Sequence, residues 1–154
     1  MTSHAVPALR QLLVAAASVA VAGLVACTTR SAPPVPRVEI QHSWARIADS
    51  GATSGAYMEI VNNDTVPITL VGVTTTDAGA AEVHETMQQD GMAHMMPRTE
   101  LRIPAGDVVK MVPGGLHVML IDLRRTLSVG DSVRLRLQFS DSTSVAATAP
   151  VKTP

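Results

Sequence analysis

A strict alternation of apolar and polar residues near the C-terminus constrains the fold of this chain more than any other feature. The apolar residues Val133, Leu135, Leu137 and Phe139 are separated at every step by arginine or glutamine. Successive side chains of a β-strand point to opposite faces, so this pattern predicts a strand with one buried face. Beyond the first 27 residues we find no sustained 3.6-residue periodicity of the kind that an amphipathic helix requires.

Short segments of this kind recur between turn residues. Residues 116–120 alternate too, so His117 and Met119 are expected together on the face opposite three apolar side chains. The sequence predicts one all-β domain, a Greek-key sandwich or barrel of about seven to nine strands. The expected strands are 38–47, 54–63, 67–76, 80–87, 99–106, 108–115, 116–123, 132–140 and 143–151.

The first 27 residues predict a leader and not part of the fold. An apolar run over residues 12–26 follows Arg10 and ends at Cys27. Leu24 at −3, a small residue at −1 and the cysteine resemble a bacterial lipobox, which predicts cleavage and lipidation of Cys27. A cleaved soluble form and an uncleaved anchor are the alternatives, since the run is only slightly shorter than a membrane span. All three place the remaining chain outside the cytoplasm.

The residues after Cys27 predict a tethered domain. Residues 28–37 are rich in proline and predict an extended tether, residues 38–151 the β domain, and residues 152–154 a short tail. Thr28 stands where an aspartate is often linked to retention in the inner membrane. We therefore expect a membrane-tethered periplasmic lipoprotein, on the outer membrane if the cell has one.

Charge and cysteine content exclude several functions. The formal net charge of −1 gives little attraction to nucleic acid. Cys27 is the only cysteine, so the domain has no disulfide, catalytic thiol or thiolate ligand. No catalytic triad, carboxylate pair or phosphate loop stands out, and residues 130–132 (GDS) lack the context of a nucleophile elbow. We expect that the protein is not an enzyme.

Residues 84–96 (HETMQQDGMAHMM) gather four methionines and two histidines around a polar turn. Soft, neutral thioethers and imidazoles favour Cu(I) over Zn(II), Mg(II) or Ca(II), and a blue-copper site would need cysteine. An ordinary packing or surface role is preferred for Met58, Met111 and His42. Exposed methionines outside the cytoplasm risk oxidation, which favours a metal-binding role for the cluster.

A second donor pair follows the turn at residues 113–115 (PGG). His117 and Met119 are two residues apart on one expected strand, so they share a face. The alternative is that Met119 faces a second core layer, because it has an apolar neighbour on each side. Since imidazole must be neutral to bind a metal, copper affinity is expected to weaken on acidification.

The spacing His84, Met95, His117, Met119 reads H-x10-M-x21-H-x-M, which resembles the signature of the periplasmic copper-chaperone family PCuAC. The resemblance covers roughly residues 38–151. Its further segments are SWARIADSGATSGAYMEIVNN, VHETMQQDGMAHM, IPAGDVVKMVPGGLHVMLIDL, LSVGDSVRLRLQF and ATAPV.

The resemblance implies a cupredoxin-like domain that binds one Cu(I) per chain, with His84, Met95, His117 and Met119 as ligands. It also implies a chaperone that passes copper on, best known for building the CuA centre of cytochrome c oxidase. The partner would be subunit II of that oxidase or a Sco-type thiol protein. Copper storage or resistance, and a β-sandwich interaction module without metal, are the alternatives.

Met92, His94 and Met96 are candidate auxiliary ligands beside Met95. The strand period places these three on one face and Met95 on the other, which argues against all four meeting one ion. Some PCuAC relatives take a second copper with a His/Met-rich C-terminal tail. Residues 144–154 contain neither residue, so a second site in the tail is not expected.

Overall fold

The structure is a computed structural model that describes residues 35–89 and 91–153. The expected leader with Cys27, and the tether up to residue 34, lie outside these residues. In the described part of the chain, no helix is long and apolar enough to cross a membrane.

Ten strands make up the described residues, which contain no helix. They are β1 (Val38–Arg46), β2 (Ser54–Asn62), β3 (Ile68–Thr75), β4 (Ala78–Gln89), β5 (Met92–Pro97), β6 (Leu101–Ile103), β7 (Val108–Met111), β8 (Leu116–Leu123), β9 (Ser132–Phe139) and β10 (Ser144–Lys152). The predicted all-β sandwich is confirmed.

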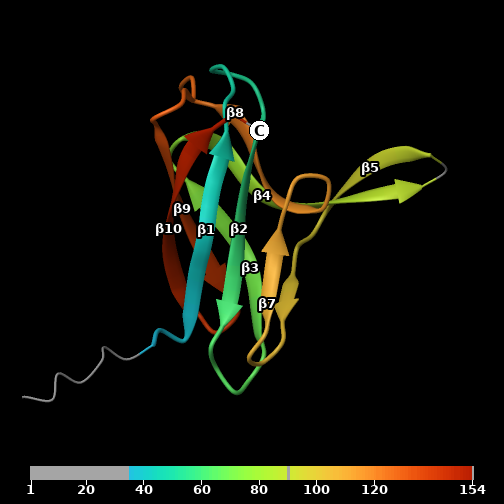
Figure 1. Cartoon of the computed structure of the whole chain (residues 1–154), viewed down its shortest axis with the longest axis vertical. Helices are drawn as coiled ribbons and strands as arrows, with labels where there is room; N and C mark the ends of the chain where they lie inside the picture. The colour runs from blue at the N-terminus through green and yellow to red at the C-terminus, as the bar shows by residue number, and fades with distance from the viewer. Residues whose placement is uncertain (1–34, 90, 154) are drawn as a thin grey trace, which may run out of the picture. The chain divides into compact units, whose positions relative to one another are not determined.

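The strands form a continuous hydrogen-bonded sheet that folds over on itself (Figure 1). Its order is β5-β4-β8-β2-β1-β10-β9-β3-β6, and β7 pairs with β2. Strands β1 and β10 run parallel and pair Ala45 with Val151 and Arg46 with Lys152, which joins the two halves of the sheet. The remaining strand pairs are antiparallel, as expected where turns connect neighbouring strands.

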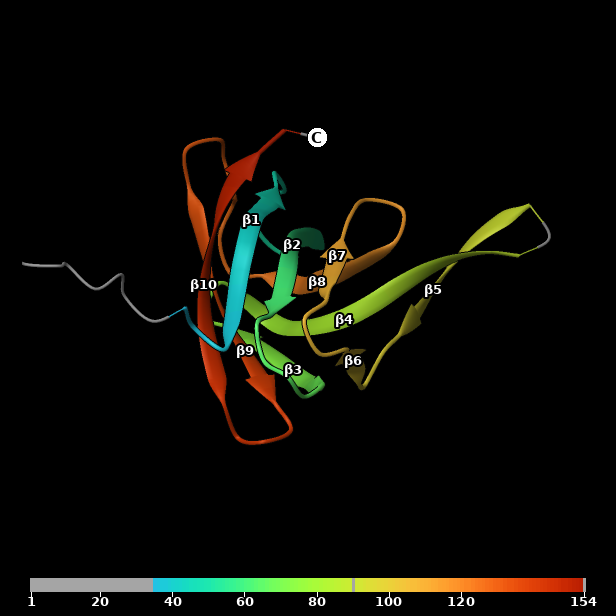
Figure 2. The same ribbon diagram turned by 60° about the horizontal axis from the view of Figure 1, so that its bottom comes forward.

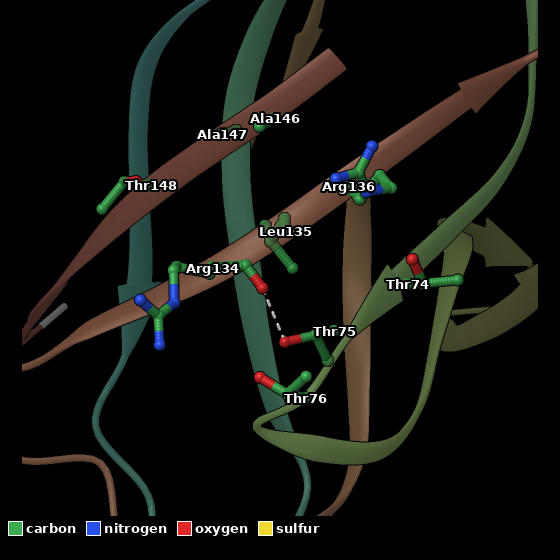
Figure 3. Close-up of a pocket in the computed structure, with 9 residues that line it drawn as sticks. All are labelled: Thr74, Thr75, Thr76, Arg134, Leu135, Arg136, Ala146, Ala147 and Thr148. Carbon is green, nitrogen blue, oxygen red and sulfur yellow. Dashed lines mark hydrogen bonds between the residues drawn. The ribbon is translucent and has the colours of Figure 1, made fainter. Parts of the chain in front are cut away.

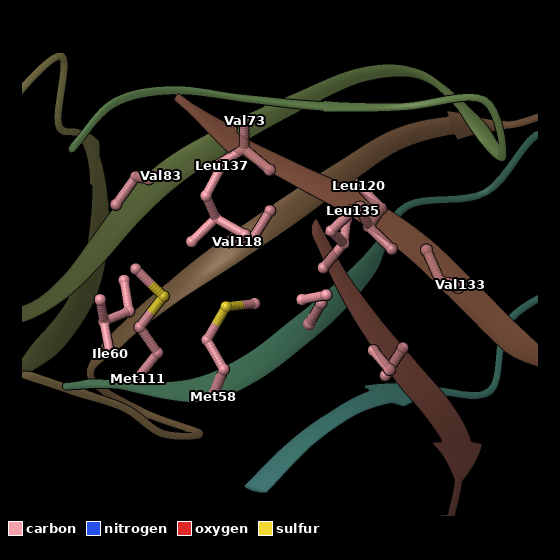
Figure 4. Close-up of a cluster of buried hydrophobic side chains, with 14 of the residues drawn as sticks. Met58, Ile60, Val73, Val83, Met111, Val118, Leu120, Val133, Leu135 and Leu137 are labelled. Carbon is pink, nitrogen blue, oxygen red and sulfur yellow. The ribbon is translucent and has the colours of Figure 1, made fainter. Parts of the chain in front are cut away.

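The alternating residues of β9 face the core, as their pattern predicts: Val133, Leu135, Leu137 and Phe139 are buried and the residues between them are exposed. On the opposite side of the core, Met58 of β2 pairs with Met111 of β7 (Figure 4). These two methionines are 1% and 2% exposed. Both are core fillers, as expected, and full burial of such a side chain stabilises a fold by about 1.5–3 kcal/mol.

Strands β4 and β5 form a hairpin that extends beyond the sandwich (Figure 2). We expected a strand only over 80–87 and none over 92–97, whereas β4 continues to Gln89 and β5 is a tenth strand. Every residue of β5 is exposed, so its sequence lacks the apolar alternation that marks a half-buried strand. Backbone hydrogen bonds to β4 hold β5 in place without burial of its side chains. Gly91, with φ of +76°, accommodates the turn.

Candidate metal centre

The two predicted histidine ligands face each other across β4 and β8. His84 and His117 are direct partners in the antiparallel ladder, and their ring centroids lie 6.1 Å apart. Met119 is two residues beyond His117 on β8, where it pairs with Glu82. Because residues two apart on a strand share a face, both histidines and Met119 leave the same side of the sheet.

The hairpin brings the fourth predicted ligand to this side. Met95 pairs with Thr86, two residues beyond His84, so Met95 and His84 lie on the same face of the hairpin. Met95, His117 and Met119 line one hollow of about 170 Å³. The structure therefore brings all four residues to one face, and their role as ligands remains a prediction.

Hydrogen bonds determine which ring nitrogen of each neutral histidine keeps its lone pair. The Nδ1 atom of His117 lies 3.0 Å from the carbonyl oxygen of Gly115, which only accepts, so Nδ1 donates and Nε2 keeps its lone pair. Likewise, the Nε2 atom of His84 lies 3.1 Å from Oε2 of Glu82. Such partners fix the tautomer and orientation of a metal-binding histidine.

The Nδ1 atom of His84 is buried and has no hydrogen-bond partner. Burying a polar atom without a partner is costly, so an atom of this kind calls for an explanation. An unprotonated imidazole nitrogen is a metal ligand, and a Cu(I) ion would satisfy it. The residues present therefore fit a soft metal ion.

Burial divides the site into a covered base and an open side. His117 is 7% exposed and the His84 side chain 13%, and Met119 is half-buried. Met95, by contrast, is 58% exposed. The sandwich thus holds three donors in place, while the hairpin presents the fourth to solvent.

Aromatic residues border the site in a way that the sequence did not reveal. A bulge between Gln41 and Trp44 shifts the register of β1, so that Trp44 pairs with Tyr57. Their ring centroids are 4.4 Å apart, and that of Tyr57 is 6.4 Å from His117. The only sequence signal was that Trp44 and Tyr57 belong to one segment, SWARIADSGATSGAYMEIVNN. Arg46 also lines the hollow and was not anticipated.

The three auxiliary candidates do not join this group. In the hairpin, Met92 pairs with Gln89, His94 with Met87, and Met96 with Glu85. These pairs alternate with the one that contains Met95, so their side chains leave the opposite face. This arrangement agrees with the separation that the strand period predicts.

A larger hollow of about 520 Å³ lies over β3, β9 and β10 (Figure 3). Two of its lining residues are hydrogen-bonded: the Thr75 hydroxyl donates to the carbonyl oxygen of Arg134 at 2.7 Å. Its lining contains no histidine, methionine or cysteine: Thr74, Thr75, Thr76, Arg134, Leu135, Arg136, Ala146, Ala147 and Thr148. The candidate metal centre is therefore identified by the side chains that line its hollow and not by the volume of the hollow.

A β-sandwich with two imidazoles and two thioethers on one face belongs to the class of soft-metal-binding domains. Residues 38–151 match the family model described as "Putative lipoprotein LpqE-like", and the chain belongs to this family.

Two curated relatives match over 116 residues each. "Putative lipoprotein Lxx21020" of Leifsonia xyli subsp. xyli (strain CTCB07) is 33% identical, and the match covers 75% of this chain and 69% of the relative. "Uncharacterized protein RP573" of Rickettsia prowazekii (strain Madrid E) is 26% identical, with 72% and 64% covered.

Solved structures of similar fold include a copper-bound PCuAC domain and a protein named with Cu(I). The copper-bound PCuAC domain from PmoF2 has a TM-score of 0.64 and 28% identity, and the match covers 79% of this chain and 97% of that domain. The solution structure of CuI-DR1885 from Deinococcus radiodurans has a TM-score of 0.58 and 32% identity, with 74% and 78% covered. These matches confirm the predicted PCuAC family and its cupredoxin-like fold.

Proposed function

We propose that this protein is an extracytoplasmic copper chaperone that carries one Cu(I) on His84, Met95, His117 and Met119. The observation that carries the proposal is the convergence of these donors on one face, where the Nδ1 atom of His84 lacks a partner. The copper-bound domain and the Cu(I) protein among the similar structures support the choice of metal, which the sequence predicted.

The donor set suits release as well as binding. Two thioethers and two imidazoles are neutral, so the donors themselves leave the charge of Cu(I) uncompensated, which favours an anionic thiolate as the next ligand. Arg46 lines the hollow and Glu82 lies beside His84, so the charges next to the donors have opposite signs. Met95, the exposed donor, is displaced first, and the more covered donors follow as further acceptor ligands bind. The ion moves by ligand exchange and remains Cu(I) throughout.

The recipient we propose is a copper-accepting protein at the membrane, namely cytochrome c oxidase subunit II at its CuA centre or a Sco-type thiol protein. Lipidation of Cys27 would hold the domain there, with residues 28–37 as tether, and on the outer membrane in a cell that has one. The lipoprotein name of the family and of the Leifsonia relative supports this anchoring. The protein acts by binding and not by catalysis.

A Cu(I) titration tests the site. The full chain, purified in detergent without oxygen, competes with a colorimetric Cu(I) chelator beside a Met95→Ala, His117→Ala double variant. We expect one tightly bound equivalent in the wild type and its loss in the double variant. Gln88→Ala, an exposed change on the same hairpin, is the matched control and keeps the tight equivalent. Tight binding that persists in the double variant would remove these residues from the site.

A transfer experiment tests the chaperone role. Copper should pass to a dithiol acceptor faster than it dissociates spontaneously into buffer. In cells, deletion should lower oxidase activity under limiting copper. Copper sensitivity with normal oxidase activity would instead identify a storage or resistance protein that uses the same site.

A further inference from the structure

The hairpin carries a second group of soft donors on the face opposite Met95. Met87 of β4 pairs directly with His94 of β5, and Met92 and Met96 lie two residues to either side of His94. All four side chains therefore leave the same face of the hairpin. We call this group the outer donor face.

These donors lie within reach of one another. Direct partners in an antiparallel ladder have Cβ atoms about 4.5–5.5 Å apart, and residues two apart on a strand are separated by roughly 7 Å. Methionine is unbranched and has three rotatable bonds, so Met87, Met92 and Met96 can bring their sulfur atoms toward the His94 ring. The geometry offers three thioethers and one imidazole to a single ion.

Packing does not account for the outer donor face. Met87, Met92 and Met96 are 48%, 61% and 54% exposed, and His94 is exposed as well. Side chains so exposed gain little of the free energy that burial provides. Thioethers in this position also risk oxidation. Their concentration around one histidine therefore points to a ligand.

The charges nearby favour a soft monovalent ion. Glu85 shares this face as the partner of Met96, but its carboxylate is bound by the Arg98 guanidinium, whose Nε donates to Oε2 at 2.7 Å. The carboxylate is thus neutralised and engaged. The donors that remain are neutral thioethers and an imidazole, which prefer Cu(I) to harder divalent ions.

We propose that the outer donor face binds a second Cu(I) through Met87, Met92, His94 and Met96. Met95 and Met96 are neighbours in the chain and leave opposite faces, so one ion cannot serve both groups. The second ion binds more weakly than the first, because its donors are all exposed and include only one imidazole. This inference does not depend on the identity of the recipient.

A stepwise titration with Cu(I) tests this site. The full chain in detergent, labelled with ¹³C in its methionine methyl groups, receives Cu(I) without oxygen. We expect the methyl signals of Met95 and Met119 to shift with the first equivalent. Those of Met87, Met92 and Met96 should shift with the second, at a free Cu(I) concentration at least tenfold higher.

Two sets of variants separate the sites. Met92→Ala, His94→Ala, Met96→Ala should lose the weak equivalent and keep the tight one, and Met95→Ala, His117→Ala should do the reverse. Gln89→Ala, on the outer face but without a soft donor, is the control and should keep both. A wild type that binds only the tight equivalent, or a weak equivalent that survives the triple variant, would overturn the second site. Failure of the proposed function would instead appear as a wild type that binds only the weak equivalent removed by the triple variant.

Discussion

The methionines of the sandwich and those of the hairpin have the same side chain in opposite surroundings. Met58 and Met111 are 1% and 2% exposed, between strands that cover them on both sides. Met87, Met92 and Met95 are 48–61% exposed on two strands that project beyond the core. The comparison shows that a methionine side chain packs in the core where strands enclose it. In the hairpin, which is held by backbone pairing, the side chain is exposed and accessible to a metal ion.

The two regions also differ in what holds them together. The sandwich is stabilised by a continuous core, whereas β5 depends on its backbone pairing with β4 and buries no side chain. Elements with few buried contacts open locally at lower free energy than the core does. This division suits the proposed copper transfer, in which a firm base would keep the histidines in place while the open hairpin would let an acceptor reach Met95.

The largest expected difference between the regions is in stability. Met58→Ala should lower the free energy of unfolding by about 2–5 kcal/mol, because it leaves a cavity in the core. The same change at Met87, which is exposed, should stay within about 0.5 kcal/mol. Urea unfolding followed by circular dichroism measures both. Equal losses would mean that the hairpin methionines also pack.

Cu(I) bound by donors of both the sandwich and the hairpin should raise the free energy of unfolding. Cu(I) at a free concentration one hundredfold above its dissociation constant should stabilise the folded chain by about 2.7 kcal/mol, since it binds only the folded site. Thermal unfolding without oxygen, with and without copper, measures the effect. A Met95→Ala, His117→Ala variant is the control, and it should gain far less from the same amount of copper.

A smaller effect is expected when only the exposed donor is removed. Met95→Ala should weaken Cu(I) binding at least tenfold, which corresponds to about 1.4 kcal/mol. Stability without copper should change little, because the side chain is 58% exposed. Competition with a Cu(I) chelator gives the affinity and urea unfolding the stability. A large loss of stability with unchanged affinity would contradict the division between base and hairpin.

The smallest effect concerns an ion cluster on the sandwich. The pKa of Asp64 is held below its usual range mainly by the backbone N–H of Thr65 and also by the Arg37 guanidinium. The pKa of Asp141 is lowered mainly by its hydrogen bonds from Thr143, and again by Arg37. A carboxyl whose pKa is lowered by folding stabilises the fold above its unfolded pKa, and this contribution disappears as pH falls through the folded pKa.

Arg37→Ala should therefore reduce stability slightly at pH 7 and make the loss of stability on acidification smaller than in the wild type. Urea unfolding at pH 7 and pH 3 tests both expectations. Copper affinity at pH 7 should be unchanged, because Arg37 belongs to the sandwich and not to the metal centre. A changed affinity would show that the two regions are more closely coupled than their contacts indicate.

Much of the fold could be predicted from sequence because burial leaves a pattern. The alternations in β8 and β9 correctly gave the faces of these strands, including the shared face of His117 and Met119. Strand β5 was missed because all its side chains are exposed, and exposed residues carry no such pattern. The bulge in β1 was missed as well, since its register depends on the pairing with β2.

The sequence by itself determined which donors are present. Its single cysteine, Cys27, ends the predicted leader, and the methionines and histidines that remain favour Cu(I) over other metals. Only the tertiary structure decided which donors meet. The ladder between β4 and β8 places His84 opposite His117, and the hairpin register turns Met95 toward them and Met96 away. The physical reason is that a strand alternates faces at every residue, so neighbours in the chain separate and distant residues converge once the register is fixed.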